Sequence, residues 1–532
     1  MTIARWTPPV APTRQEQFLL KRLDRVRKLL GFLRLHRHEL FDEGFQQELA
    51  TMYRTTGAGK EARPPALMAM AVLVRGYLGM SDAEMIELTV VDLRVQMVLG
   101  CLGAEAPPFS QGALHEFRER LIAFDLDRRL LERTLELAKR TKAFDYRKLP
   151  QTLRVAIDSS PLEGAGRVED TFNLLAHAAR NVVQCAARLV GWTEAQVCTR
   201  AGIPLLAASS IKQALDIDWN DADDKAEAIK TFARQLDALQ AWITHHLPEE
   251  AAKPPLKAQI ETLVQIRAQD LEPDPLGGGP RIRAGVAEDR RISIEDADMR
   301  HGRKSKSKRF NGFKRHIAAD VDRGLILACA ITPANRPEDD AVPALTIDLD
   351  RQGLAIDQLL IDRGYINSAL VDEVISRRGK IVCQPWKSHN GRLFPKSAFT
   401  LNLRDRTIAC PNGHVQRVTF GKVVEFDPDV CDRCALRPQC TTAEFGQGRS
   451  IAIAENEPLQ HRLRKQIQTS AGRGALRERT MIEHKLAHIS QRQGNDARYL
   501  GLRKNTFDLR RASAIQNLET LHRAEIEGRK AA

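Results

Sequence analysis

Two short apolar runs that each stop at an aspartate constrain the fold of this chain most strongly. Residues 155–157 (Val-Ala-Ile) end on Asp158, and residues 359–361 (Leu-Leu-Ile) end on Asp362. Runs of this length predict buried strands, and in open α/β sheets ligand sites lie beyond the carboxyl ends of strands. Each aspartate alone also fits an ordinary Asx-turn at a strand end. Both together at one sheet edge would predict a metal site.

Helical and strand signals along the rest of the chain predict the α/β class. Residues 14–145 and 171–268 repeat apolar side chains at helical spacing. Ser81 and Thr193 each open a capping-box pattern, so helices are expected to begin after them. We therefore expect an α/β sheet interrupted by one long helical insertion. Further strands are expected at 312–321, 324–332, within 356–365 and at 380–384, and a Pro/Gly-rich linker at 272–280.

The length of 532 residues predicts several domains rather than one core. The N-terminal helices are short and joined by tight turns, so they are compatible with a DNA-binding helix-turn-helix or a dimerisation domain, and equally with a plain helical bundle. The expected divisions are a helical N-terminal domain (1–148), a catalytic core (149–170 and 291–384), a helical insertion with its linker (171–290), a Cys-rich insertion (385–450) and C-terminal helices that complete the core (451–532).

A third carboxylate comes from the predicted helix at residues 477–489. Glu483 lies four residues after Arg479, which by itself predicts only a weak ion pair on a helix face. If this helix packs across the sheet, Glu483 would join Asp158 and Asp362. Three carboxylates are suited to two Mg²⁺ or Mn²⁺ ions, because hard cations prefer oxygen ligands. Such a pair of ions assists displacement at a phosphate.

Four of the nine cysteines are close together in the sequence. The spacing of Cys410, Cys431, Cys434 and Cys440 is typical of a four-thiolate zinc site, in which His414 could replace one thiolate. The alternative is a group of reduced structural cysteines. The other five, scattered in apolar contexts, are expected to be small core residues. They are Cys101, Cys185, Cys198, Cys329 and Cys383.

The charge distribution predicts a polyanionic partner. The chain carries 81 Lys and Arg against 68 Asp and Glu, a net charge of +13. Residues 300–316 contain eight Lys or Arg and no acid, and residues 461–532 contain 16 against seven acids. Clustered cations favour a phosphate backbone. The longest apolar stretch (64–74) is too short to cross a membrane, and the N-terminal residues lack the apolar core of a signal peptide. We therefore expect a cytoplasmic protein.

Taken together, these motifs resemble the DDE-class transposases of bacterial insertion sequences, in particular the IS-eleven-eighty-two-like group related to the IS-four/IS-five superfamily. The resemblance implies an RNase-H-like catalytic core in which Asp158, Asp362 and Glu483 bind the metal ions. It implies that Arg479 contacts DNA near the scissile phosphate, and that a zinc-ribbon-like insertion precedes the last helices. The resembling segments are 64–100, 155–175, 292–321, 331–340, 359–367, 477–489 and 498–521.

The chain departs from related groups at two positions. Those groups place a Tyr three residues before the Arg and a Lys seven residues after the Glu, where this chain has Leu476 and Ser490. A role in handling a DNA hairpin is therefore not carried over to these positions.

The function expected from the sequence is DNA transposition. The enzyme would cleave double-stranded DNA at the ends of a transposable element and transfer the strands to target DNA, as a homo-oligomer associated with the nucleoid. A stand-alone metal nuclease of the same fold and a catalytically retired DNA-binding protein are the alternatives. The residues expected to contact DNA are Arg479, Arg300, Lys304, Lys308, Arg309, Lys314, Arg503 and Lys504.

Overall fold

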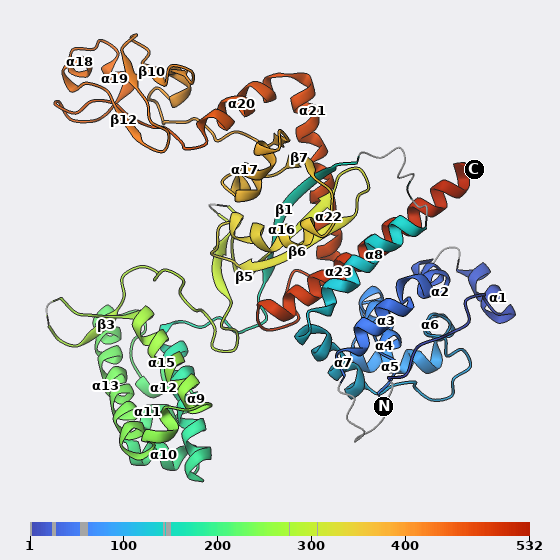
Figure 1. The fold of residues 1–532 in the computed structure, drawn as a ribbon. Helices are drawn as coiled ribbons and strands as arrows, with labels where there is room; N and C mark the ends of the chain where they lie inside the picture. The colour runs from blue at the N-terminus through green and yellow to red at the C-terminus, as the bar shows by residue number, and fades with distance from the viewer. Residues whose placement is uncertain are drawn as a thin grey trace.

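A computed structural model describes residues 3–23, 28–53, 62–141, 144, 151–275, 277–305 and 307–531 of the chain. Helices and sheets are both present, so the predicted α/β class is confirmed. Figure 1 shows a central sheet, N-terminal helices on one side of it, and two further units that extend away on the other side.

The central sheet has six strands, and its order is β4-β5-β1-β7-β8, with β6 paired to β5 on the edge away from β1. β1 runs parallel to β7, and β7 runs parallel to β8, whereas β5 is antiparallel to β1, β4 and β6. The middle of the sheet is dry, because Val155, Ala156 and Ile157 are fully buried. The strands are β1 (Leu153–Glu163), β4 (Arg300–Arg303), β5 (Arg309–Asp320), β6 (Ile326–Pro333), β7 (Ile356–Leu360) and β8 (Lys380–Val382).

The sequence suggested that the first strand stops at Asp158, but in the structure it does not. It continues to Glu163 because β5 pairs with it over the whole stretch, from Val155 opposite Asp320 to Glu163 opposite Gly312. Only the parallel neighbour ends early: the last β1–β7 pair is Ala156 with Leu360. Asp158 is therefore paired with β5 on one side, whereas on the other side it lies beyond the last residue that pairs with β7.

Eight helices form the described part of the N-terminal region. The predicted capping box at Ser81 is present, with its side chain accepting from the Glu84 N–H. α4 is buried on nearly every face, which explains its almost entirely apolar sequence. The helices are α1 (Arg14–Arg22), α2 (Lys28–Leu40), α3 (Glu43–Ala50), α4 (Pro65–Leu78), α5 (Asp82–Val91), α6 (Leu93–Leu99), α7 (Gln111–Ala123) and α8 (Leu126–Arg140).

No single helix among the described residues has the length and apolarity needed to cross a membrane; only α4 and α5 together, bent by 103°, pass such a test.

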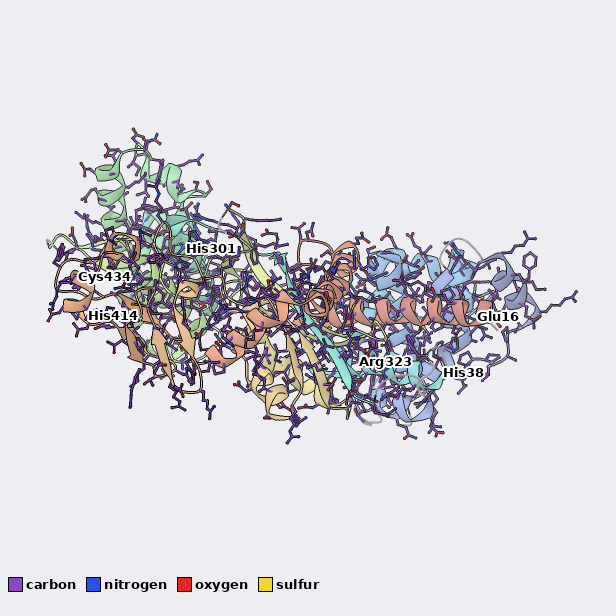
Figure 2. The ribbon with its side chains drawn as sticks, turned by 90° about the horizontal axis from the view of Figure 1, so that it is seen from above. Glu16, His38, His301, Arg323, His414 and Cys434 are labelled. Carbon is purple, nitrogen blue, oxygen red and sulfur yellow. The ribbon has the colours of Figure 1, made fainter. Side chains whose placement is uncertain are left out.

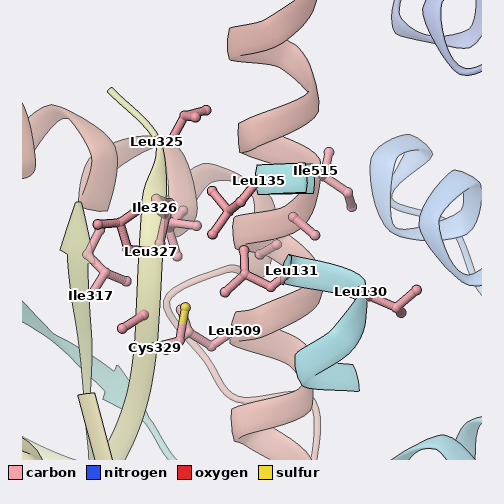
Figure 3. Close-up of a cluster of buried hydrophobic side chains, with 14 of the residues drawn as sticks. Leu130, Leu131, Leu135, Ile317, Leu325, Ile326, Leu327, Cys329, Leu509 and Ile515 are labelled. Carbon is pink, nitrogen blue, oxygen red and sulfur yellow. The ribbon is translucent and has the colours of Figure 1, made fainter. Parts of the chain in front are cut away.

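The last helix, α23 (Leu502–Ala531), joins the N-terminal helices to the sheet. It packs against α8 on one side and against β6 on the other. Figure 3 shows this core, in which Leu131 and Leu135 of α8 and Leu509 of α23 approach Leu327 and Cys329 of β6. The N-terminal helices and the sheet therefore share one continuous hydrophobic core.

The helical insertion has its own core, built on the long helices α9, α13 and α15. Its capping box at Thr193 is also present. The expected linker at 272–280 is instead a hairpin, because Leu271–Pro273 (β2) pairs with Pro280–Ile282 (β3). Its helices are α9 (Thr171–Val190), α10 (Glu194–Ala201), α11 (Pro204–Ala207), α12 (Ile211–Leu215), α13 (Ala222–His246), α14 (Pro248–Ala251) and α15 (Leu256–Asp270).

The Cys-rich unit also has a small core of its own, centred on Phe399, Ile408 and Phe426. α20 (Glu457–Gln468), α21 (Ser470–Glu478) and α22 (Thr480–Gln493) lead from it back to the sheet. Its elements are β9 (Thr400–Asn402), β10 (Thr407–Ala409), β11 (Val415–Arg417), β12 (Val423–Glu425), β13 (Ser450–Ala452), α18 (Pro428–Asp432) and α19 (Arg437–Cys440). Two further helices pack against the central sheet. α16 (Val342–Asp350) lies between β6 and β7 in the chain, and α17 (Ala369–Ser376) lies between β7 and β8.

Candidate active site

A polar cleft of about 470 Å³ lies where β1, β7 and α22 meet. Asp158, Asp362 and Glu483 all line it, although they are separated by up to 325 residues in the sequence. Glu338, between β6 and α16, is a fourth carboxylate in its wall. The structure thus brings the three predicted acids to one cavity and adds an acid that the sequence analysis did not select.

The two aspartates occupy equivalent places on parallel strands. Each lies two residues beyond the last paired residues of β1 and β7, which are Ala156 and Leu360. Each also folds back in the same way: Asp158 Oδ1 accepts the Ser159 N–H at 2.8 Å, and Asp362 Oδ1 accepts the Arg363 N–H at 2.8 Å. This matched geometry holds both carboxylates at the same end of the sheet.

Arg479 connects the sheet to the helix that carries Glu483. Its Nη1 donates to Asp158 Oδ2 at 2.9 Å, and its Nη2 donates to Glu483 Oε1 at 3.0 Å. The predicted ion pair between Arg479 and Glu483 is confirmed, but the continuous helix predicted at 477–489 is wrong. The chain breaks between α21 and α22 at Arg479, which ends the first helix and precedes the second. This break turns the guanidinium toward the sheet.

A buried arginine holds α22 in place. Arg315 of β5 is 1% exposed, and it donates to Ser160 Oγ on β1 at 2.8 Å. The same guanidinium donates to Ser490 Oγ at 2.6 Å, to Gln493 Oε1 at 3.1 Å and to the Gly494 carbonyl at 2.9 Å. Ser490 therefore serves as an anchor for the helix. Burial lowers the pKa of Arg315 to about 10, so the group remains charged at neutral pH.

The cleft carries an excess of negative charge at Asp158. Burial is the largest cause that raises the pKa of this carboxyl to about 6, and the negative charges of Asp362 and Glu338 raise it further. The charge of Arg479 and the Ser159 N–H act in the opposite direction without cancelling the effect. A perturbed carboxyl in a cleft is typical of a functional site.

Glu338 links the two aspartate loops. Its Oε1 accepts the Ser159 Oγ–H at 2.6 Å, next to Asp158. On the other side its carboxylate lies so close to Gly364 that a Cβ at that position would collide with it. A side chain two positions after Asp362 would therefore have to displace the Glu338 carboxylate. The one sequence signal for Glu338 was its place just after the third predicted strand.

A buried network fixes the loop that follows Asp362. The Tyr365 hydroxyl lies 2.7 Å from His316 Nδ1, and Thr332 Oγ1 lies 2.9 Å from His316 Nε2. Burial lowers the pKa of His316 to about 3, aided by the charge of Lys314, so the ring is neutral. These contacts tie the residue after Gly364 to β5 and β6.

The residues expected to contact DNA fall into three groups. Lys304 and Lys314 line the cleft, together with Arg303, and Lys308 and Arg309 are exposed nearby. Residue 306 of the same basic block lies outside the described residues. Arg479, as described above, contacts two of the cleft carboxylates.

The remaining three cations are held by carboxylates within the protein. Arg300 is buried and donates to Asp289 at 2.9 Å. Arg503 pairs with Asp127, and Lys504 pairs with Glu119 at 3.0 Å. The structure therefore gives these three residues a packing role, which their charge alone did not reveal.

The four clustered cysteines gather around one small cavity of about 30 Å³, which His414 also lines. Figure 2 shows Cys434 and His414 in the same part of this unit. All four thiols are free. Burial raises the pKa of Cys440, and the neighbouring thiols Cys431, Cys410 and Cys434 contribute to the same direction.

Within the described residues, no group of three or more His, Cys, Asp or Glu side chains is arranged to hold a metal ion. The predicted zinc site is therefore not supported by the geometry. At the cleft, Arg479 lies between Asp158 and Glu483 and donates to both. The donor chemistry nevertheless fits Mg²⁺, because carboxylate oxygens face one cleft and their mutual repulsion would be relieved by a cation.

Comparison with known protein families gives a match to the C-terminal part of the chain. Residues 409–522 match the model of the family described as Transposase DDE domain. The matched segment contains the four clustered cysteines, α22 with Glu483, and most of α23. This confirms the resemblance to DDE-class transposases. No curated protein and no solved structure matches the chain.

Proposed function

We propose that this DDE-class transposase cleaves double-stranded DNA at the ends of a transposable element and joins the freed strands to target DNA. In the first step, water breaks a phosphodiester bond and leaves a 3′-hydroxyl. In the second step, that hydroxyl attacks a phosphodiester of the target, and the target's own 3′-oxygen leaves. Both steps are in-line displacements at phosphorus.

The observation that carries the proposal is the common cleft of Asp158, Asp362 and Glu483, together with the family match that includes Glu483. In the proposed site these three carboxylates hold Mg²⁺ or Mn²⁺. When bound, such ions activate the attacking oxygen and stabilise the leaving oxygen. The chain itself supplies the cations that orient the DNA phosphate, namely Lys304 and Lys314 in the wall of the cleft and Arg479 beside the carboxylates.

The sheet order supports an RNase-H-like core as part of this proposal. Across the sheet the strands lie in the order β6-β5-β1-β7-β8. β5 and β6 form an antiparallel hairpin on one side, and β1, β7 and β8 are parallel to one another. Asp158 and Asp362 lie just beyond the last pair of the parallel strands β1 and β7, at the edge where ligands bind in open sheets. A transposase must also hold two element ends at once, so we expect the active form to be an oligomer.

For the Cys-rich unit we propose a structural role, with zinc held by Cys410, Cys431, Cys434 and Cys440. The proposal rests on the sequence spacing of the four cysteines, which is typical of a four-thiolate site. Metal analysis of the purified protein tests the proposal: one equivalent of zinc is expected, and its loss is expected in Cys434→Ser.

The experiment for the catalytic proposal replaces each carboxylate in turn. Asp158→Ala, Asp362→Ala and Glu483→Ala should each abolish Mg²⁺-dependent cleavage of a duplex that carries the element ends, while duplex binding is retained. Joining is tested separately with precut ends. Cleavage without joining would instead indicate a metal nuclease, and retained cleavage in any variant would remove that residue from the site.

A further inference from the structure

A second polar cavity, of about 670 Å³, lies on another side of α22 from the cleft. Its walls come from the start of α2, the end of α4, the C-terminal half of α22 and the middle of α23. α22 faces the cleft with Glu483, Ala487 and Ser490, and faces the second cavity with His488, Gln491 and Arg492. One helix therefore forms a wall of both.

The second cavity is strongly basic, and we call it the basic cavity. Lys28, Arg492, Arg498 and Arg523 line it, against Glu519 as the one carboxylate among its described lining residues. Four positive charges and one negative charge leave a surplus of three. Glu519 is already occupied, because its Oε2 accepts from Arg492 at 2.7 Å.

His488 in the wall of the basic cavity has its pKa lowered, mainly by burial and further by the positive charge of Arg523. Mutual repulsion raises the free energy of cations crowded around one cavity, and a bound anion would lower it.

Arg492, Arg498 and Arg523 make contacts within the protein, although the last two are exposed. Arg492 is fixed by Glu519 and lies with its guanidinium carbon 5.7 Å from the centre of the Tyr77 ring. Arg498 donates to the Arg492 carbonyl at 3.3 Å, and Arg523 donates to the Glu519 carbonyl at 3.3 Å. Because these contacts use only part of each guanidinium, donors remain for a phosphate.

We infer that the basic cavity binds the phosphodiester backbone of double-stranded DNA, at a segment other than the one in the cleft. A helix is about 10 Å across, so a single phosphate cannot lie both here and beside Glu483. The cations come from α2, α22, α23 and the segment between α22 and α23, and this spread suits an extended polyanion better than a compact one. The inference rests on the proposed function and assigns a second contact to the same DNA-bound enzyme.

Duplex binding at several salt concentrations, measured by fluorescence anisotropy in EDTA, tests the inference without requiring cleavage. The variant Arg498→Ala/Arg523→Ala should lower the slope of log affinity against log salt by about 1 to 2, because each lost phosphate contact removes about 0.9. The matched control is Arg188→Ala/Arg234→Ala, two exposed arginines of the helical insertion. Equal slopes for the two double variants would overturn the inference.

A second measurement leaves the cations in place. A photo-crosslinking residue at Gln491, which is exposed and lines the basic cavity, should crosslink to the duplex, whereas one at Gln184 of the insertion should not. Excess ATP is added in a third arm. Crosslinking that ATP abolishes at low concentration, or no crosslinking at Gln491, would show that DNA is not the ligand.

The outcomes separate this inference from the proposed function. If Gln491 crosslinks but no variant of the three cleft carboxylates alters cleavage, the cavity stands and the catalytic proposal falls. If the carboxylate variants abolish cleavage and the salt slope is unchanged, the reverse holds.

Discussion

Arg479 donates a hydrogen bond of 2.9 Å to Asp158, a residue 321 positions earlier in the chain. With its second nitrogen it holds Glu483, so one guanidinium joins the sheet to α22. This places a positive charge between carboxylates that would otherwise repel each other. In the proposed enzyme the same arginine is positioned to contact DNA once cations take over that role.

Replacement of Arg479 tests this arrangement. We expect Arg479→Ala to lower the rate of DNA cleavage by about 10²–10³-fold, the usual effect of removing one preorganised donor to a developing charge. Arg477→Ala, an exposed arginine two residues earlier, is the matched control. Single-turnover cleavage at saturating Mg²⁺ is the measurement, and equal rates for the two variants would contradict the role of Arg479.

Gly364 and Glu338 should act as one unit. A methyl group at position 364 would displace the Glu338 carboxylate, and with it the hydrogen bond to Ser159 beside Asp158. We therefore expect Gly364→Ala and Glu338→Ala each to slow cleavage by roughly tenfold, about 1.4 kcal/mol. The Gly364→Ala/Glu338→Ala double variant should be no slower than either single one. Additive losses in this double-mutant cycle would show that the two residues act independently.

Arg315 should matter for the position of α22 rather than for chemistry. Arg315→Leu removes four hydrogen bonds, one to Ser160 of β1 and three to residues at the end of α22. Leaving a buried polar partner without its hydrogen bond costs about 1–3 kcal/mol. Hydrogen exchange should become faster in residues 480–493 while β1 and β7 keep their protection. Unchanged exchange in α22 would contradict the anchoring role.

The sequence predicted the parts of the site that depend on local pattern. The apolar runs before Asp158 and Asp362 are strands, and the helical spacing around Glu483 is helical in the structure. Glu338 could not be selected, because its role depends on Gly364 and Ser159, which are neighbours only after folding. The same reason applies to Arg503 and Lys504: their partners Asp127 and Glu119 are almost 400 residues away.

Errors in the predicted element boundaries have a similar cause. The β1 strand continues beyond Asp158 because β5 pairs with it, and the glycine-rich segment at 272–280 closes a hairpin rather than a flexible linker. The break at Arg479 lies within a stretch of good helix formers, where local propensity gives no signal to stop. Tertiary pairing decided each of these points.

The pairing of α2 with α23 predicts a pH-dependent stability. Burial alone would lower the pKa of His36, but hydrogen bonds and charges from Glu525 and Glu39 outweigh it, so the pKa is raised above 6.5. The stabilisation is therefore complete below pH 6.5 and is lost as the pH rises through the folded-state pKa. His36→Gln should cost on the order of 1 kcal/mol at pH 5.5 and little at pH 8.5.

Thermal unfolding at the two pH values measures this effect. His38→Gln is the control, because that side chain is 41% exposed and lies only two residues along the same helix. A loss of stability in His36→Gln that is the same at both pH values would contradict the predicted linkage.

Iron-directed cleavage of the polypeptide tests most directly whether Asp158, Asp362 and Glu483 share a cation site. Fe²⁺ replaces Mg²⁺, and the radicals that it generates with ascorbate and peroxide cut the backbone close to the bound ion. Scission is predicted at three separated places, near residues 158, 362 and 483, and all three should disappear together in Asp158→Ala. Scission at one of these places alone, or persistence of the other two in that variant, would contradict a shared site.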